Sequence, residues 1–488
     1  MTKGVDNKHK SWSDHQKDWQ QIRDCIDGER CVKARTTEYL PHPSNTDKDQ
    51  VRYDNYKLRA NFFNVTGRTL VGLCGAVNRK PPSVLLDPSL EYMQENADGN
   101  GCSIQQCAKE TLEEVVALGR CGLLVDFPVV GEVPITKEQE EALRLQATII
   151  TYKAEEIINW RETIVGSQTV LKMVVLKREV QSHNADDVFL NETETEYRVL
   201  GLDEDGNYYQ NIYVEQKANN ATGTGDFTLI NTFYPRGADG KLLREIPFVF
   251  VGANNLKPNV DKSPLIDIVK LNLSHYRNSA DYEESNFLLG QPTLLLTGLT
   301  QSWIDTVWKN QAITIGARAA IKLPEGGDGK FLQINESGAL EKAMRVKEEQ
   351  MVALGARIIT NDKKGVESAE SIYLKQSGDA SVLATIADNT GDAYTRALYF
   401  AGLFMGATGE SFFGFNDDFF AIPLSREDAE KVMLLWQGGL YSKRDARMLL
   451  RQGELLDKDR TDEEIDDDID QEQMNTPNAD LDEDEADE

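Results

Sequence analysis

The chain has 488 residues and a formal net charge of −28 at pH 7. Segment 457–488 holds seventeen acidic residues against two basic ones, Lys458 and Arg460, which leaves −13 on the first 456 residues. This balance excludes a basic footprint for gripping nucleic acid at the level of the whole chain. If DNA is a partner, an acidic surface repels its phosphates, so we expect the DNA to slide past the protein and not to be bound tightly.

The composition also narrows the class of protein. Hydrophobic residues make up 40% of the chain, which is enough for packed cores. None of the six cysteines stands in a CxxC pair, so we expect reduced thiols and no zinc. We expect no signal peptide and no membrane span, because the N-terminus is polar and apolar runs are short. The most apolar stretch, 397–407, is expected to be the buried end of a helix.

The first half of the chain is predicted to begin with helices and continue with strands. Helices are expected over 12–28, over 53–77 without a break, and over 103–118, where Gly119 ends the helix. A short strand over 121–128 follows. Paired prolines after residue 77 end the second helix.

Alternating and β-branched residues then predict a sheet between residues 154 and 251. The expected strands are 169–177, 194–202, 208–214 and 246–252. The acidic turn 203–207 is predicted to join two of them as a plain hairpin. A calcium loop is the alternative, but position twelve from Asp203 is Val214 and not Glu.

Two long helices are predicted on either side of a compact insert. Apolar residues at 3–4 spacing predict the first over 264–289, with Ser263 as N-cap and Pro264 in the first turn. The second is predicted over 339–360. The insert is expected to hold strands 292–297 and 312–323, a helix over 301–309 and a turn at the GGDG sequence, 326–329. Packed antiparallel, the helices would place this insert at their far end.

The rest of the chain is predicted to be mainly helical. A polar loop, 361–370, precedes a long helix over 371–404 with Gly378 and Gly391 as kink points. A strand over 412–422 and helices over 425–437 and 442–452 follow, with Ser425 and Ser442 as N-caps. Past Asp457 the chain is acidic and poor in apolar residues, so we expect it to be mostly disordered.

Catalytic motifs fail on inspection. Gly329 and Lys330 are followed by Phe331, so no P-loop is encoded, and neither GxSxG nor HExxH occurs. Two acidic runs, Asp417-Asp418 and 466–468, could suggest a metal-dependent nuclease, although a turn or cap is the simpler reading of the first and the second lies in the acidic tail. Lys363 and Lys364 in the polar loop are either a solvated pair or a weak, non-specific phosphate contact.

The order of these elements resembles that of bacteriophage portal proteins. Segment 52–82 (RYDNYKLRANFFNVTGRTLVGLCGAVNRKPP) and segment 117–128 (ALGRCGLLVDFP) resemble a portal-like phage family labelled only as a domain of unknown function. Segment 415–456 resembles the portal pattern of an acidic strand, a Ser-initiated helix and a second helix opened by "G-aliphatic-x-Ser". The likeness spans residues 12–470.

The resemblance implies an α+β, portal-type subunit. Its parts would be an N-terminal wing (1–262), first stem helix (263–287), clip (288–338), second stem helix (339–360), tunnel loop (361–370), wing with a long helix (371–422), helical crown (423–470) and disordered acidic tail (471–488). The tunnel loop would bring Lys363 and Lys364 near DNA. The acidic tail has no clear portal counterpart.

The resemblance also implies partners and a role. Portal subunits form rings, typically of twelve copies, at one capsid vertex of a virion assembled in the host bacterial cytoplasm. Double-stranded DNA passes through the ring, which docks the large terminase subunit, capsid or scaffold proteins, and tail or adaptor proteins. We therefore expect no enzyme activity, no catalytic residue, no metal and no cofactor. The alternatives are another virion structural or adaptor protein, or a metal-dependent phosphodiesterase.

Overall fold

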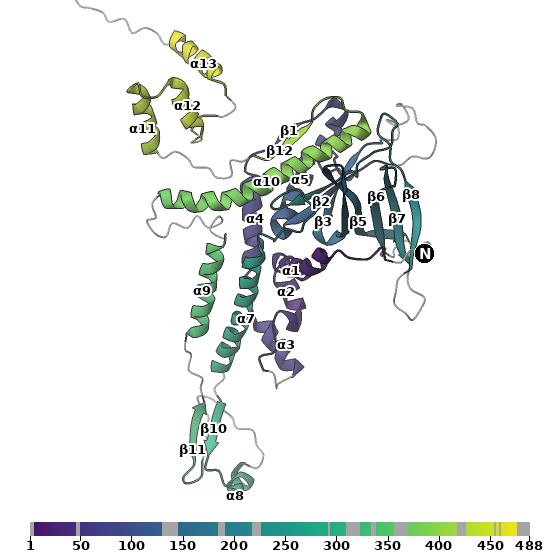
Figure 1. Ribbon diagram of the computed structural model, residues 1–488. Helices are drawn as coiled ribbons and strands as arrows, with labels where there is room; N and C mark the ends of the chain where they lie inside the picture. The colour runs from purple at the N-terminus through teal and green to yellow at the C-terminus, as the bar shows by residue number, and fades with distance from the viewer. Residues whose placement is uncertain are drawn as a thin grey trace, which may run out of the picture. The chain divides into compact units, whose positions relative to one another are not determined.

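The computed structural model consists of two compact units, 1–417 and 418–488. The described residues are 4–44, 49–128, 145–183, 191–216, 226–290, 293–308, 323–332, 338–355, 369–416, 426–452, 455–457 and 460–475. The first unit mixes helices and sheets, so the α+β prediction is confirmed (Figure 1). No helix in these ranges is both long enough and apolar enough to cross a membrane.

A buried three-stranded sheet forms the centre of the first unit. Strand β2 (Arg120–Asp126) lies between β3 (Thr148–Lys153) and β9 (Phe248–Gly252), antiparallel to both. Helix α5 (Ile104–Leu118) precedes β2 and begins with a capping box formed by Ser103 and Gln106. Gly119 ends α5 in the left-handed conformation, with φ at 79°, as the sequence predicts.

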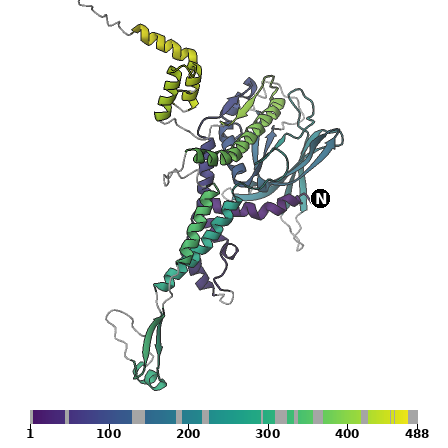
Figure 2. The same ribbon diagram turned by 60° about the vertical axis from the view of Figure 1, so that its left-hand side comes forward.

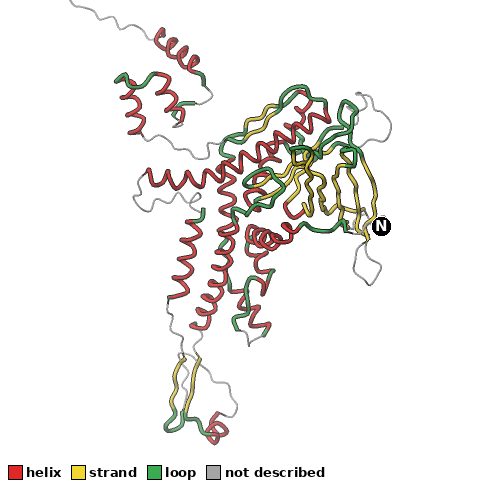
Figure 3. The backbone as a smooth tube through the Cα atoms, in the orientation of Figure 1, coloured by secondary structure: helices red, strands yellow, loops and turns green. Residues whose placement is uncertain are grey.

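A larger antiparallel sheet carries three of the four strands predicted between residues 154 and 251, whereas the predicted strand 246–252 belongs to the three-stranded sheet as β9. The order of the larger sheet is β4 (Ile157–Val165), β5 (Gln168–His183), β6 (Asn191–Leu202), β7 (Tyr208–Gln216) and β8 (Asp226–Phe233) (Figure 3, yellow). In the turn between β6 and β7, the Asp203 carboxylate accepts hydrogen bonds from the backbone N–H and the Nδ2 of Asn207, at 2.8 and 3.2 Å. These bonds lower the pKa of Asp203. The hairpin prediction is confirmed, and this carboxylate is engaged in its own turn.

The long helix α10 (Ala369–Met405) packs on the three-stranded sheet beside α5. The hydroxyls of Tyr394 and Thr111 lie 3.0 Å apart, and Asn389 Nδ2 donates to the carbonyl of Gly252 at 3.0 Å. The predicted buried helix end is confirmed, since Leu398 and Ala401 are fully buried. The helix is continuous across both predicted kink points.

A short strand pair joins distant parts of the sequence beside α10. Strand β1 (Ser83–Leu85) is antiparallel to β12 (Phe412–Gly414), which is shorter in the described chain than the predicted 412–422. The Thr395 hydroxyl bonds the carbonyl and the N–H of Phe413, both at 3.1 Å. These two bonds fix the returning strand on α10.

The prediction of one unbroken helix over 53–77 is wrong. The segment forms α3 (Gln50–Arg59) and α4 (Val65–Val77), separated by extended residues. Asn64 caps α4 by accepting a hydrogen bond from the backbone N–H of Gly67 at 2.8 Å. The backbone N–H of Asn61 donates to the Ser279 hydroxyl at 3.1 Å, away from any helical partner. A cap and a tertiary bond therefore override local helix propensity.

The second unit consists of the helices α11 (Arg426–Gln437), α12 (Lys443–Gln452) and α13 (Asp462–Asn475). The predicted cap of α12 is confirmed, because the Ser442 hydroxyl accepts from the backbone N–H of Asp445 at 3.1 Å. The backbone N–H of Ser442 donates in turn to the Asp445 carboxylate, also at 3.1 Å. This reciprocal pair fixes the first turn of α12.

The expectation of disorder past Asp457 is wrong for α13, which also extends into the tail assigned to 471–488. The backbone N–H of Thr461 donates to the Glu464 carboxylate at 2.9 Å, which closes the first turn of the helix. Acidic residues in that turn also suit the positive end of the helix dipole. Residues 476–488 lie outside the described part.

Replacing Gly119 by alanine is expected to destabilise the first unit. An added Cβ would lie 3.1 Å from the carbonyl oxygen of Lys262 and 3.2 Å from that of Asp261, at a positive φ. We expect a loss of about 1–3 kcal/mol, measured as a lower thermal midpoint of the full chain by circular dichroism. The control is Gly75→Ala, which meets no atom within 4 Å in α4 and should leave the midpoint unchanged or slightly higher. Equal effects at both positions would contradict this account.

Candidate functional site: the helix pair and its insert

Helix α7 (Ile266–Leu289) is the first of the two predicted long helices and is fixed at its start by Ser263. The Ser263 hydroxyl accepts from the backbone N–H of Leu265 at 3.2 Å and donates to the carbonyl of Ala117 at 2.6 Å. The predicted cap thus shapes the turn before the helix, which begins two residues later than expected. The same hydroxyl ties this turn to the end of α5.

Helix α9 (Ala339–Ala353) packs antiparallel on α7, and the two lie side by side in both views (Figures 1 and 2). His275 Nε2 lies 3.1 Å from a Glu348 carboxylate oxygen, and Lys347 Nζ donates to the carbonyl of Ser274 at 3.2 Å. Further along, an added Cβ on Gly355 would lie 3.9 Å from Ile268. The later residue of the second segment, Gly355, thus lies beside the earlier residue of α7, Ile268, while Glu348 lies beside His275. The two segments run in opposite directions, which confirms the predicted antiparallel pair.

On its other side α7 is tied to α4 by a buried amide. Asn272 is fully buried, and its Oδ1 accepts from the backbone N–H and the hydroxyl of Thr66 at 3.2 and 3.0 Å. Its Nδ2 donates to the carbonyl of Phe63 at 2.8 Å. The side chain therefore closes the start of α4 onto the middle of α7, with its oxygen and nitrogen both satisfied.

Further toward its C-terminus, α7 is tied to α3 by charged and phenolic groups. The Tyr56 hydroxyl donates to the Asp281 carboxylate at 2.6 Å, and Arg59 forms an ion pair with Glu284. Burial, together with the bond to Asp281, raises the pKa of Tyr56. The Arg59 guanidinium also lies 4.1 Å from the ring centre of Phe287. Helix α7 thus has α3 and α4 on one side and α9 on another.

The insert between α7 and α9 contains an antiparallel strand pair. Strand β10 (Thr293–Thr297) pairs with β11 (Asp328–Leu332), with Leu295 opposite Lys330. Between them lie α8 (Gln301–Trp303) and a single π-helical turn, Ile304–Trp308, so the predicted first strand and helix are confirmed.

The predicted strand 312–323 falls almost wholly outside the described part, and the strand that pairs with β10 was not predicted. Residues 309–322 lie outside the described part, and the partner of β10 begins inside the GGDG sequence, where a turn is expected over all four residues. Gly298, at φ 76°, explains the close turn: an added Cβ would lie 2.9 Å from the carbonyl oxygen of Gly326. The backbones of the two glycines meet there, and the strand starts at Asp328.

Of the residues predicted to contact DNA or to bind a metal, only those of the run 466–468 belong to the described part of the chain. Lys363, Lys364, Asp417 and Asp418 lie outside the described residues. In the run 466–468, Asp466 forms ion pairs with Lys443 and Arg447, and Asp468 pairs with Arg460. No group of three or more His, Cys, Asp or Glu residues in the described ranges could hold a metal ion.

A buried cation in the first unit was not predicted from the sequence. Arg120, at the start of β2, is 1% exposed, and its guanidinium carbon lies 4.0 and 4.9 Å from the ring centres of Trp160 and Phe250. Its nitrogens have no hydrogen-bond partner among the described residues. Burial lowers the pKa of this side chain. The aromatic partners lie 40 and 130 positions away in the sequence, so no local pattern could have indicated them.

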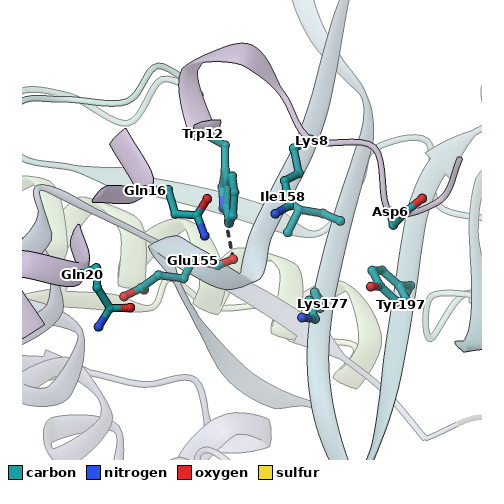
Figure 4. A pocket seen from close by; sticks show the side chains of 9 residues that line it. All are labelled: Asp6, Lys8, Trp12, Gln16, Gln20, Glu155, Ile158, Lys177 and Tyr197. Carbon is teal, nitrogen blue, oxygen red and sulfur yellow. Dashed lines mark hydrogen bonds between the residues drawn. The ribbon is translucent and has the colours of Figure 1, made fainter. Parts of the chain in front are cut away.

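A second missed feature is a polar hollow of about 390 Å³ between α1 (Lys10–Asp27) and the larger sheet (Figure 4). Lys8 Nζ lies 4.2 Å from the ring centre of Trp12, and Trp12 Nε1 donates to the carbonyl of Glu155 at 3.1 Å. The Glu155 carboxylate is itself paired with Arg23. The nine lining residues include no His, Cys or Ser, so they offer no nucleophile–base pair of the usual kind.

Comparisons with known proteins give a family model and distant structural likenesses. Residues 264–405, from the start of α7 to the end of α10, match "Domain of unknown function (DUF4055)". No curated protein matches the chain. Similar solved structures include "Virion of native gene transfer agent (GTA) particle" (13% identity, TM-score 0.40, 86% of this chain and 98% of that chain). Another is "Neck of native GTA particle computed with C12 symmetry" (13%, 0.40, 79% and 89%). At this distance they assign no function to this chain.

Asn272→Leu is expected to loosen the contact between α4 and α7. The substitution keeps the branched shape of the side chain but leaves the Thr66 donors and the Phe63 carbonyl without their partner, at a cost of about 2–4 kcal/mol. The control is Asn278→Leu on the same helix, where the amide makes no hydrogen bond to the described residues. Urea unfolding of both variants measures the difference. A midpoint for Asn272→Leu no lower than that of the control would show that the buried amide does not hold the helices.

Proposed function

We propose that the chain is a structural subunit of a phage-type virion and, more specifically, a portal subunit. Copies would form a ring at one capsid vertex through which DNA enters during packaging and leaves during ejection. The ring would dock the terminase motor first and tail or adaptor proteins afterwards. The subunit itself would be a conduit and not an enzyme.

The observation that carries this proposal is the antiparallel pair α7–α9 with a strand pair inserted between its helices. Helix α7 has 24 residues, about 36 Å of helix, and is anchored to α3 and α4 by Tyr56, Arg59 and Asn272. The same pair leaves Leu288, Val346 and Leu354 between 41% and 48% exposed. Apolar side chains on a rigid helix pair suit burial against a neighbouring copy, and a head-to-tail contact that closes by rotation gives a ring.

Charge and motif content agree with a passive channel. The sequence lacks a P-loop, so a separate motor would hydrolyse ATP. The first 456 residues carry a net negative charge, which disfavours trapping a polyanion. Contacts with phosphate would then be few, and Lys363 and Lys364 remain the proposed pair in the tunnel loop.

Two other functions compete with the portal. An adaptor of the same virion would also assemble into rings, but adaptors are usually far shorter than this chain. A metal-dependent phosphodiesterase would need fixed carboxylates, and Asp466 is held by two cations instead. Metal-dependent nuclease activity lost on Asp417→Ala would favour the phosphodiesterase.

Electron microscopy of the purified full chain is the decisive measurement. We expect rings, because a head-to-tail contact between copies that closes by rotation gives a ring. The central channel should be about 20 Å wide or more, which is the width that duplex DNA requires. A monodisperse monomer across a range of salt and protein concentrations would overturn the proposal.

The double variant Lys363→Ala/Lys364→Ala tests the tunnel-loop assignment. We expect ring assembly to be unchanged while DNA packaging or retention is altered, because the loop lysines would contact phosphate without contributing to the subunit interface. Ring integrity is checked by electron microscopy and retained DNA by nuclease protection of packaged particles. Rings that fall apart would mean that the loop is structural.

A further inference from the structure

Helix α12 carries a row of three cations on one face. Lys443, Arg447 and Arg451 stand four residues apart, so they lie on one side of the helix at intervals of about 6 Å. Successive phosphates along one DNA strand are separated by a distance of the same order, so cations at this interval can each meet a phosphate. We call these three residues the basic stripe.

The carboxylates of α13 occupy the basic stripe in this structure. Asp466 pairs with both Lys443 and Arg447, and Asp462 lies 2.6 Å from Arg451 and 3.9 Å from Arg447. The two cations hold the pKa of Asp466 down at about 2. Asp462 and Asp466 are also four residues apart, so the acidic row has the spacing of the cationic row that it faces.

The contact between the two helices is mainly electrostatic. Helix α13 has eight acidic residues among fourteen and no basic one. Its one buried apolar side chain in the described part is Ile465, while Ile469 is 37% exposed and Met448 of α12 is 50% exposed. A helix held by a large apolar surface would have buried these side chains, so charge complementarity, with little apolar burial, holds α13 in place.

We propose that the basic stripe is a phosphate-binding surface for duplex DNA, and that α13 covers it as an acidic competitor within the same chain. The identity of the ligand rests on the proposed portal function. Helix α13 presents carboxylates where DNA would present phosphates. Displacing it would uncover Lys443, Arg447 and Arg451 together.

The tether makes this competition selective. Nine residues separate α12 from α13, and a connection of this length gives an effective concentration on the order of millimolar. Free duplex binds non-specifically with dissociation constants of about 10⁻⁴–10⁻⁶ M, and partly exposed ion pairs are weak individually. Helix α13 therefore prevents dilute DNA from binding to the basic stripe. DNA already threaded through the same assembly is present at a comparable local concentration and competes successfully.

The test is DNA binding by the full-length double variant Asp462→Asn/Asp466→Asn. Asparagine keeps the size of each side chain while removing the charge that neutralises the stripe. Fluorescence anisotropy with a labelled duplex of about 30 bp should show at least tenfold tighter binding than the wild type at low salt. The slope of log K against log salt should steepen by about 2–3, as expected for three cations that meet phosphate.

The matched control is Asp467→Asn/Asp470→Asn. It removes the same charge from exposed positions of the same helix that make no ion pair with the stripe in the described structure. Binding should change less than twofold. An equal gain in the control would overturn the proposal, because it would reflect net charge alone. Adding Lys443→Gln, Arg447→Gln and Arg451→Gln to the double variant should abolish the gain, and a gain that persists would place the DNA elsewhere.

Folding of the variants and assembly into rings are measured separately from DNA binding. If the double variant loses helical circular dichroism, Asp466→Asn alone, which keeps the Arg451–Asp462 pair, is measured instead, with a gain of about threefold expected. No gain in a folded variant overturns the inference. If the chain forms rings but the variant gains no DNA affinity, the portal proposal stands and the inference about the basic stripe fails. If the variant gains DNA affinity but the chain forms no rings, the portal proposal fails and the DNA-binding basic stripe stands.

Discussion

The buried amide of Asn272 fixes where α7 stands, and the helix pair depends on that position. Apolar packing between helices favours contact but tolerates sliding by a turn, since one aliphatic side chain replaces another. The bonds from Asn272 to Thr66 and Phe63 permit one register only, because any shift would leave buried donors and a carbonyl unpaired. With α7 fixed on α4, the contact of His275 with Glu348 then sets the height of α9. The positions of α7 and α9 together determine where the two ends of the insert lie.

Elements that depend on local pattern could be predicted from the sequence. The 3–4 spacing of apolar residues gave α7 and α9, and the Asp203 turn between alternating strands gave the β6–β7 hairpin. Ser103, Gly119 and Ser442 marked helix ends because each side chain, or its absence, acts within a turn or two of the chain.

Features that depend on distant residues could not be predicted in the same way. The break between α3 and α4 needs Ser279, more than 200 positions away, to accept the N–H of Asn61. The pairing of β10 with β11 was not predicted, because it depends on the close approach of Gly298 to Gly326 in the folded chain. The cationic contact of Arg120 with Trp160 and Phe250 likewise exists only in the folded sheet. For the candidate site, helices and a first strand were predictable, but their anchors were not.

The acidic C-terminus shows how composition can mislead about structure while remaining informative about chemistry. A segment with few apolar residues cannot offset its ordering entropy by burial alone, which is why disorder was expected there. Helix α13 has a different source of order: Asp462 and Asp466 lie opposite cations that α12 already fixes in a row. Order obtained from charge, unlike order from apolar burial, weakens with salt and can be replaced by any polyanion of similar spacing. A helix stabilised in this way is therefore suited to exchange with DNA in a way that a hydrophobically docked helix would not be.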